Sequence, residues 1–342
     1  MRAAVMRSKQ LFVDDVPEPV PGPGQVLVET IACGICGSDL HTLKYPEQMA
    51  ASAAASAAPM AFDIDQNMVM GHEFSARIVG LGPGVTGFAE GDVVVSMPVL
   101  VTPEGFAAIG YSNQWPGGYS ERMVLSAMLC TKVPEGLDPR HAALTEPMAV
   151  GLHALAKSGV KAGEGALVYG CGPVGLAVIA ALRIAGITPI VAADFSPARR
   201  ALAKTMGAHE VVDPKQEQGI AAWQRVDGAQ PLVLFEAVGV RGMLDQAMRD
   251  APRGSRILVV GVCMEQDSIW PMVAIGKELN IQFALGYDPL EFNRTLGMIA
   301  DGQINVAPLI TGEVGIAGVP EAFRTLAQPD AHAKILVEPS LG

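Results

Sequence analysis

Two short segments of this 342-residue chain carry side chains that can bind a metal ion. Residues 36–41 read CGSDLH, and residues 71–73 read GHE. Thiolate sulfur together with imidazole nitrogen suits zinc, and three protein ligands with an open fourth position are typical of a catalytic zinc. The two segments therefore predict a zinc site that takes part in chemistry rather than one that only stabilises the fold.

Cys36 is the first candidate ligand. Two alternatives compete with this interpretation: a buried, inert cysteine, which is the usual state of a free thiol, and a redox pair with Cys33. A Cys-x-x-Cys redox pair is expected where a strand meets a helix in a small redox fold, whereas this segment follows a strand in a β-rich region. The context favours a ligand over a redox pair.

His72 is the second candidate ligand, and Glu73 makes its segment acidic. Asp39 is able to accept the second ring N–H of His72, as carboxylates behind metal-binding histidines do. Glu146, which precedes Pro147, is a third candidate. The alternative for Glu146 is a structural role beside the positive end of a helix that starts there.

Ser38 and His41 lie three residues apart, so one helical turn would place them on the same face. A hydroxyl beside a reacting alcohol that passes its proton to a more exposed histidine is a workable proton relay. The alternative is a helix-capping serine and a surface histidine.

Residues 170–175 read GCGPVG, the glycine-rich turn of a dinucleotide-binding unit. Here the turn follows a predicted strand, opens a predicted helix and is followed about twenty residues later by an acid, Asp194. A carboxylate there accepts hydrogen bonds from ribose hydroxyls and repels a 2′-phosphate, so NAD is expected over NADP, although Arg200 lies nearby. The alternative is a glycine turn that only packs. The expected cofactor-binding residues are Gly170, Gly172, Pro173, Val174, Gly175, Asp194 and Arg199.

Two patterns of elements must position these residues. Alternating residues and turn signals predict strands at 25–31, 75–81, 92–97 and 119–125, which indicate an antiparallel β domain. Apolar strands then alternate with helical patterns, which indicates a parallel sheet covered on both faces. The strands of this second part are expected at 166–169, 189–193, 210–213, 232–236, 256–262 and 281–285, with the clearest helices at 174–185 and 197–206.

The end of the chain and one internal segment complete the pattern. Helices are expected at 291–300 and 320–327, followed by a last strand at 334–338. Residues 49–60 are rich in alanine and serine, which fits either a short helix that covers a substrate or a surface loop.

Composition excludes several classes of protein. A net charge of −11 argues against a nucleic-acid partner, because phosphate binding needs a basic face. The most apolar stretch, residues 166–187, is interrupted by glycines, Pro173 and Arg183, so a membrane span is not expected. Five cysteines without a secretory signal do not form a disulfide framework, so a reducing cytoplasm is expected.

Together these motifs resemble the zinc-containing alcohol and polyol dehydrogenases of the medium-chain dehydrogenase/reductase superfamily. The resemblance covers nearly the whole chain. Beyond the segments already described it rests on Gly34, Ile35, Phe74, residues 90–92 (EGD), residues 117–119 (GGY) and residues 145–147 (TEP).

The resemblance implies an α/β protein with a GroES-like, β-rich catalytic domain formed by residues 1–150 and 290–342. Residues 151–289 would form a Rossmann domain with a doubly wound parallel sheet. Cys36 and His72 would be zinc ligands. Glu73 and Glu146 each match a carboxylate that lies near or on the zinc in relatives.

The resemblance also assigns the remaining roles. Ser38 and His41 match the proton-relay positions, and Asp39 matches the acid behind the histidine ligand. Asp194 and Arg199 match ribose contacts of NAD-dependent members. Relatives form dimers or tetramers, and the apolar strand at 281–285 is a candidate for pairing across a two-fold axis.

One departure from the family changes the zinc count. Many relatives hold a structural zinc with four cysteines, but this chain has no cysteine from residue 37 to residue 129. A four-cysteine site is therefore impossible, one catalytic zinc is expected, and packing must hold residues 99–116.

The expected reaction is reversible, NAD-linked oxidation of an alcohol or diol, preferably secondary and fairly apolar, to a carbonyl. Zinc would lower the pKa of the alcohol and polarise the carbonyl. Two other classes remain open: a zinc-free, NADPH-dependent reductase of the same superfamily, and a non-catalytic dinucleotide-binding protein.

Overall fold

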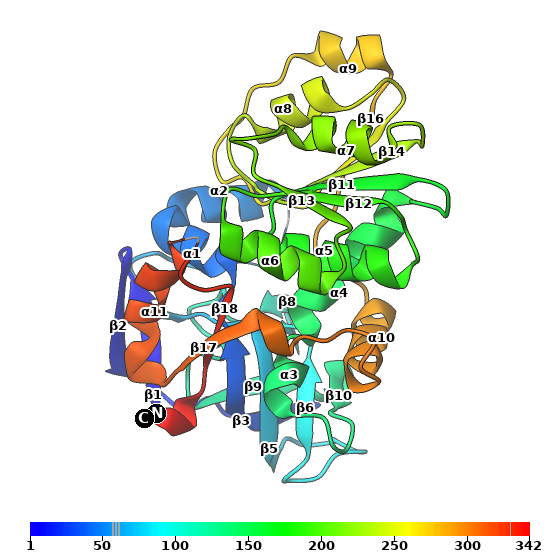
Figure 1. Cartoon of the computed structure of the whole chain (residues 1–342). Coiled ribbons are helices and arrows are strands. Elements are labelled where there is room, and N and C mark those ends of the chain that lie inside the picture. Colours follow the sequence, from blue (N-terminus) through cyan, green and yellow to red (C-terminus); the bar gives the residue numbers. More distant parts are fainter. Residues whose placement is uncertain (57, 59, 61, 329) are drawn as a thin grey trace. The chain divides into compact units, whose positions relative to one another are not determined.

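A computed structural model describes residues 1–56, 58, 60, 62–328 and 330–342 (Figure 1). The chain divides into two compact units. Unit 1 consists of Met1–Glu146, Phe292–Gly302 and Ile310–Gly342, and unit 2 consists of Pro147–Glu291 and Gln303–Leu309.

Unit 1 is built mainly from antiparallel strands. Its main sheet has the strand order β10-β6-β5-β3-β18-β17, with β9 also paired to β3. These strands are β3 (Gln25–Gly34), β5 (Glu73–Leu81), β6 (Val93–Ser96), β9 (Arg122–Ser126), β10 (Cys130–Lys132), β17 (Ile310–Val314) and β18 (Lys334–Val337). β18 pairs antiparallel with β3 at Leu336↔Gly34 and parallel with β17, so the end of the chain joins the sheet formed by its beginning.

Smaller sheets and helices complete unit 1. A second sheet has the order β2-β1-β4 and consists of β1 (Arg2–Arg7), β2 (Gln10–Asp15) and β4 (Met68–Val69). A hairpin pairs β7 (Val99–Thr102) with β8 (Gly105–Ala108). The helices that lie wholly in this unit are α1 (Gly37–Lys44), α2 (Pro46–Ser56), α3 (Pro139–Ala143) and α11 (Val319–Leu326).

The segment that lacks cysteines is held by apolar packing and hydrogen bonds. Leu100 and Ile109 are fully buried in the core of unit 1. Val101 N–H donates to Ser126 Oγ at 2.7 Å, and Gln25 Nε2 donates to Val101 O at 3.1 Å. These contacts tie the β7–β8 hairpin to the neighbouring strands.

Unit 2 contains a parallel sheet in the order β13-β12-β11-β14-β15-β16, the strand order of a doubly wound dinucleotide-binding fold. The strands are β11 (Gly165–Tyr169), β12 (Ile190–Ala193), β13 (Glu210–Val212), β14 (Leu232–Glu236), β15 (Arg256–Val259) and β16 (Asn280–Phe283). β11, β12 and β14 are buried along their whole length, as expected for central strands of a parallel sheet.

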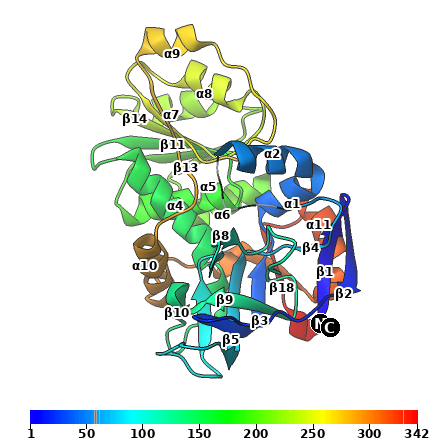
Figure 2. The same cartoon turned by 180° about the vertical axis from the view of Figure 1, so that it is seen from behind.

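Helices cover both faces of this sheet. In both views α5 (Pro173–Ile184) and α6 (Pro197–Met206) lie on one face, and α7 (Gly219–Asp227) and α8 (Met243–Asp250) lie on the other (Figures 1 and 2). The remaining helices are α9 (Pro271–Lys277), α4 (Thr145–Ser158) and α10 (Pro289–Ala300). The expected fold class, a β-rich GroES-like domain with a Rossmann domain, is confirmed.

Two further expectations concern helical segments. The alanine-rich segment is helical through Ser56 as part of α2, with Met49 and Ala53 buried; residues 57 and 59 lie outside the described residues. No helix among the described residues combines the length and apolar character needed to cross a lipid bilayer.

Candidate active site

Cys36 lies between the end of β3 and the start of α1, where it is the N-cap residue. Its backbone N–H donates to Oδ2 of Asp39 at 3.1 Å, so the aspartate of the first turn caps the helix from within. The sequence CGSD therefore starts α1 and fixes the backbone of Cys36 against the Asp39 carboxylate.

His72 and Glu73 lie where the chain enters β5, after a glycine that no other residue replaces easily. Gly71 has φ +102°, and a Cβ atom there would lie 2.7 Å from the ring of Tyr119. A side chain at position 71 would therefore require both a strained backbone and displacement of an aromatic ring. This close packing determines where His72 projects.

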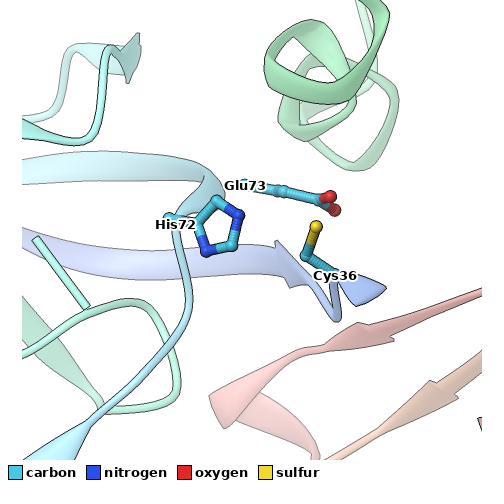
Figure 3. Close-up of side chains that lie close together, drawn as sticks. All are labelled: Cys36, His72 and Glu73. Atoms are coloured by element: carbon cyan, nitrogen blue, oxygen red, sulfur yellow. The ribbon is translucent and has the colours of Figure 1, made fainter. Parts of the chain in front are cut away.

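The structure brings Cys36, His72 and Glu73 together, and the ligand atoms of the three residues all lie within 4.8 Å of one another. Figure 3 shows one ring nitrogen of His72 pointing toward the Cys36 sulfur and the Glu73 carboxylate. Nδ1 of His72 lies 3.3 Å from Oδ1 of Asp39, which leaves Nε2 available to a metal ion. Sulfur, nitrogen and oxygen donors in one buried cluster fit zinc.

The electrostatic field at His72 also favours a cation. Burial opposes a charge on the ring, but the nearby Asp39 and Cys36 outweigh burial and raise the pKa of His72 well above its usual range. A pocket that would hold a proton on an imidazole in this way attracts positive charge in general. The donor atoms of the cluster and the negative charge around them therefore both favour a metal cation.

Glu73 is also part of a buried ion pair that the sequence did not reveal. Nζ of Lys334, on β18, lies 2.7 and 2.6 Å from the two carboxylate oxygens of Glu73 and donates to Ile35 O at 3.0 Å. Lys334 is 2% exposed and Glu73 is fully buried. Burial works to lower the pKa of Lys334, but Glu73, Cys36 and Glu146 together raise it.

Glu146 occupies the first turn of α4, at the end of the first segment of unit 1. Among the described residues, the metal-binding cluster consists of Cys36, His72 and Glu73 and does not include Glu146. Glu146 nevertheless contributes to the field around the site, because its charge raises the pKa of Lys334.

Asp39 is the centre of the hydrogen bonds behind the cluster. It accepts from Tyr119 Oη at 2.6 Å and from Tyr111 Oη at 2.9 Å, in addition to the Cys36 N–H. Burial works to raise the pKa of Asp39, yet His72 and these donors lower it, so the carboxylate stays ionised. In the sequence Tyr119 is marked only by the GGY motif, and no motif marks Tyr111.

The two predicted relay residues are both on α1, but no hydrogen bond joins them in the described part of the chain. Ser38 Oγ is 2.9 Å from the hydroxyl of Tyr111, and Nδ1 of His41 is buried without a hydrogen-bond partner. Burial, helped by the charge of Lys44, lowers the pKa of His41. His41 is therefore a neutral base at pH 7, available to receive a proton.

The glycine turn of unit 2 has the geometry that the fingerprint requires. Gly170 has φ +88° at the end of β11, Gly172 caps α5, and Pro173 is the first residue of that helix. A Cβ atom on Gly175 would lie 1.9 Å from Gly170 O, whereas one on Gly172 would meet only Nη1 of Arg199, at 4.0 Å. The helix N-terminus is thus open to an anion. The remaining predicted residue of the turn, Val174, lies in the first turn of α5.

Asp194 follows β12 and lies beside this turn. Its Oδ2 accepts from Cys171 N–H and its Oδ1 from Ser196 N–H, each at 2.8 Å. Arg200 donates to the backbone oxygens of Asp194 and Phe195. The carboxylate is thereby held at the end of the strand where a ribose would lie.

Comparison with known proteins agrees with the fold of both units. Residues 22–135 match the family model of the alcohol dehydrogenase GroES-like domain, and residues 173–301 match that of the zinc-binding dehydrogenases. The chain is 32% identical to (R,R)-butanediol dehydrogenase of Bacillus subtilis (strain 168), over 97% of each chain. It is 28% identical to sorbitol dehydrogenase of Gallus gallus, over 95% of this chain and 92% of that one.

Comparison with solved structures indicates the same family. The crystal structure of 2R,3R-butanediol dehydrogenase from Bacillus subtilis superposes with a TM-score of 0.83 at 31% identity, over 99% of each chain. A protein from Sinorhizobium meliloti 1021, solved bound to NADP, has a TM-score of 0.83 at 28% identity over 99% of each chain. The chain belongs to the zinc-containing alcohol and polyol dehydrogenases of the medium-chain dehydrogenase/reductase superfamily. It is an oxidoreductase of that family and uses a nicotinamide dinucleotide.

Proposed function

We propose that this enzyme holds a single zinc ion through Cys36, His72 and one of two glutamates, Glu73 or Glu146, and oxidises an alcohol or diol with NAD. The observation that carries the proposal is the convergence of Cys36, His72 and Glu73 within 4.8 Å, with Asp39 behind the histidine. Glu73 is the nearer carboxylate, but its two oxygens are already paired with Lys334.

The side chains of unit 1 divide the work. When bound, zinc supplies Lewis acidity that favours the ionised alcohol and polarises the carbonyl in the reverse direction. Asp39 fixes the tautomer and orientation of His72. Ser38 accepts the alcohol proton, and His41, whose pKa is lowered by burial, receives a proton on its way to solvent.

The substrate is a small, neutral alcohol. Two relatives of this chain are a butanediol dehydrogenase and a sorbitol dehydrogenase, which supports a secondary alcohol or diol. In this enzyme the oxidised carbon would become a ketone or aldehyde, and the hydride would pass to the nicotinamide.

The central experiment combines metal analysis with a substrate screen. Protein purified without chelators should contain about one equivalent of zinc and reduce NAD with members of a panel of secondary alcohols and diols. Cys36→Ala should lose zinc and turnover but keep NADH affinity, because the cofactor residues lie in unit 2. Zinc below about a tenth of an equivalent would favour the zinc-free reductase. Cofactor binding without turnover would favour the non-catalytic alternative.

NAD rather than NADP is proposed as the cofactor, on the basis of Asp194. Its carboxylate lies at the end of β12 and would repel a 2′-phosphate, while Arg199 would contact the ribose. Asp194→Gly also removes the hydrogen bonds to Cys171 N–H and Ser196 N–H, so affinity for both cofactors should fall. The ratio of kcat/KM for NAD to that for NADP should fall as well, and an unchanged ratio would refute the discriminating role.

The roles of the two domains and the oligomeric state are also proposals. Residues 1–150 and 290–342 are assigned to catalysis and residues 151–289 to dinucleotide binding. β16 is an edge strand with Phe283 exposed and Leu285 exposed just beyond it, which supports a homodimer or homotetramer formed through this edge. Phe283→Asp should release monomers in sedimentation experiments, and unchanged sedimentation would exclude this interface.

Free thiols at all five cysteines support a cytoplasmic location, where a thiolate ligand stays reduced. Cell fractionation would test that location.

A further inference from the structure

The hydroxyl of Tyr111 lies between two residues of the proposed machinery. It is 2.9 Å from Ser38 Oγ and 2.9 Å from Oδ1 of Asp39. The ring of the same residue lies against His72, with ring centroids 5.3 Å apart. One buried side chain therefore touches the proton acceptor, the carboxylate behind the metal site and a candidate ligand.

A set of close glycine contacts holds Tyr111 in this place. Gly110 has φ +84°, and a Cβ atom there would lie 3.0 Å from Gly71 O. A Cβ atom on Gly117 would lie 2.3 Å from the same oxygen. The backbone before Tyr111 thus packs directly on the backbone before His72, and neither can move without the other.

The single proton of the Tyr111 hydroxyl sets the direction of its hydrogen bonds with Asp39 and Ser38. A tyrosine hydroxyl has one proton and can donate to only one of its two neighbours. The Asp39 carboxylate also accepts from the Tyr119 hydroxyl and the Cys36 N–H, and a hydrogen bond to a carboxylate is stronger than one to a neutral hydroxyl. The Tyr111 proton therefore goes to Asp39, and the Tyr111 oxygen accepts the proton of Ser38. With its own O–H turned toward Tyr111, Ser38 presents a lone pair for another proton.

We propose that Tyr111 is a positioning residue that presents the Ser38 hydroxyl as the acceptor of the alcohol proton. The inference rests on the proposed function, in which Ser38 begins the relay. Ser38 gains the proton of the alcohol on that lone pair, then turns its hydroxyl away from Tyr111 and releases one proton toward His41. Ser38 and Tyr111 therefore each end the transfer with the one proton with which they began. Tyr111 thus directs the transfer without carrying a charge.

Tyr111→Phe tests this role, because it keeps the ring against His72 and removes only the hydroxyl. The kcat for alcohol oxidation should fall about tenfold at neutral pH, with zinc content, NADH affinity and KM close to wild type. The difference should shrink toward about twofold at high pH, because solvent hydroxide replaces the misoriented relay. A loss of packing alone would not depend on pH in this way.

Tyr119→Phe is the matched control. Tyr119 also donates to Asp39, at 2.6 Å, but the other neighbour of its hydroxyl is Gly34 O, at 3.3 Å, and not Ser38. Any loss of kcat in this variant should be the same at all pH values. If Tyr111→Phe and Tyr119→Phe gave equal, pH-independent losses, Tyr111 would act only through Asp39 and the proposal would be wrong.

A double-mutant cycle separates this inference from the proposed function. Ser38→Ala should lower kcat, and adding Tyr111→Phe should cause little further loss, since there is no hydroxyl left to orient. A full additional loss in the double variant overturns the role of Tyr111 while the relay stands. Wild-type turnover in Ser38→Ala overturns the relay itself, and the inference with it.

Discussion

Each unit buries a carboxylate beside its functional residues, and the two carboxylates differ in charge balance. Asp39 in unit 1 is fully buried and Glu236 in unit 2 is 3% exposed. Burial tends to raise both pKa values. At Asp39 the effects of His72, Tyr119 and Cys36 outweigh burial and lower the pKa. At Glu236 two backbone N–H donors, from Gly239 and Val238, do not outweigh it, and the pKa is raised.

The two carboxylates differ in pKa because they hold different groups in place. Asp39 accepts hydrogen bonds from two tyrosines and a helix N-terminus and lies 3.3 Å from an imidazole nitrogen, so it fixes side chains of the proposed site. Glu236 closes the turn after β14 by accepting from Val238 N–H and Gly239 N–H, so it fixes backbone. The proposed site of unit 1 is thus built from side chains around the Asp39 carboxylate. The proposed site of unit 2 is built mainly from backbone turns.

The strongest test of the side-chain site in unit 1 is Lys334→Met. This change leaves the buried Glu73 carboxylate without its cation, which typically costs about 3–5 kcal/mol of unfolding free energy. Denaturant unfolding measures the loss. Lys9→Met, which removes the exposed partner of Glu47, is the matched control and should change stability very little.

The double variant Lys334→Met with Glu73→Gln distinguishes an unpaired charge from lost packing. Removing both charges should restore a large part of the stability, because no ion is then left buried alone. If the double variant were as unstable as Lys334→Met, the ion pair would not be the cause.

The glycine turn of unit 2 offers the corresponding test of a backbone site. Gly175→Ala forces a methyl group onto Gly170 O and should destabilise unit 2 by about 1–3 kcal/mol. Gly172→Ala meets almost no protein atoms, so the fold should persist while a methyl group obstructs the pyrophosphate and weakens NADH binding about tenfold or more. Thermal unfolding and NADH fluorescence titration separate the two effects. Wild-type NADH affinity in Gly172→Ala would show that the turn does not receive the cofactor.

Asp39→Asn tests whether the negative charge of Asp39, and not only the shape of its side chain, is needed for zinc binding. The amide keeps the size of the side chain but weakens the orientation of His72, so zinc affinity should fall about 10- to 100-fold. Competition with a chromophoric chelator gives this affinity directly. Unchanged zinc affinity would mean that packing alone orients His72.

Sequence patterns were sufficient for the six strands of the parallel sheet and for the ligand candidates. The continuous apolar strands from β11 onward and the glycine turn follow from local signals, and so do Cys36, His72 and Glu73, each marked by its own short motif. The hairpin of β1 and β2 was missed because its turn residues, Ser8 and Lys9, adopt positive φ without a glycine to mark them.

The partners of these ligands could not be read from sequence, because they come from distant segments. Lys334 reaches Glu73 across 261 positions and looked only like the start of an apolar strand, although a lysine leading a buried strand was a usable signal. Tyr111 reaches Ser38 across 73 positions and lies in an irregular segment. Contacts of this kind depend on sheet pairing and glycine packing, which local patterns do not encode.

The smallest expected effect concerns the charge of Glu236. Its pKa lies above its ordinary value of 4.5, so the folded state keeps a proton that the unfolded state has lost, and stability falls as pH rises through this window. Glu236→Gln keeps an oxygen for the two backbone donors and removes the titration. Relative to wild type, the variant should therefore gain stability as pH rises above the ordinary pKa of the carboxyl group and through its raised value in the folded state. Urea unfolding at several pH values measures this, with the exposed Glu104→Gln as control. A relative loss of stability with rising pH would show that Glu236, like Asp39, is stabilised as an anion.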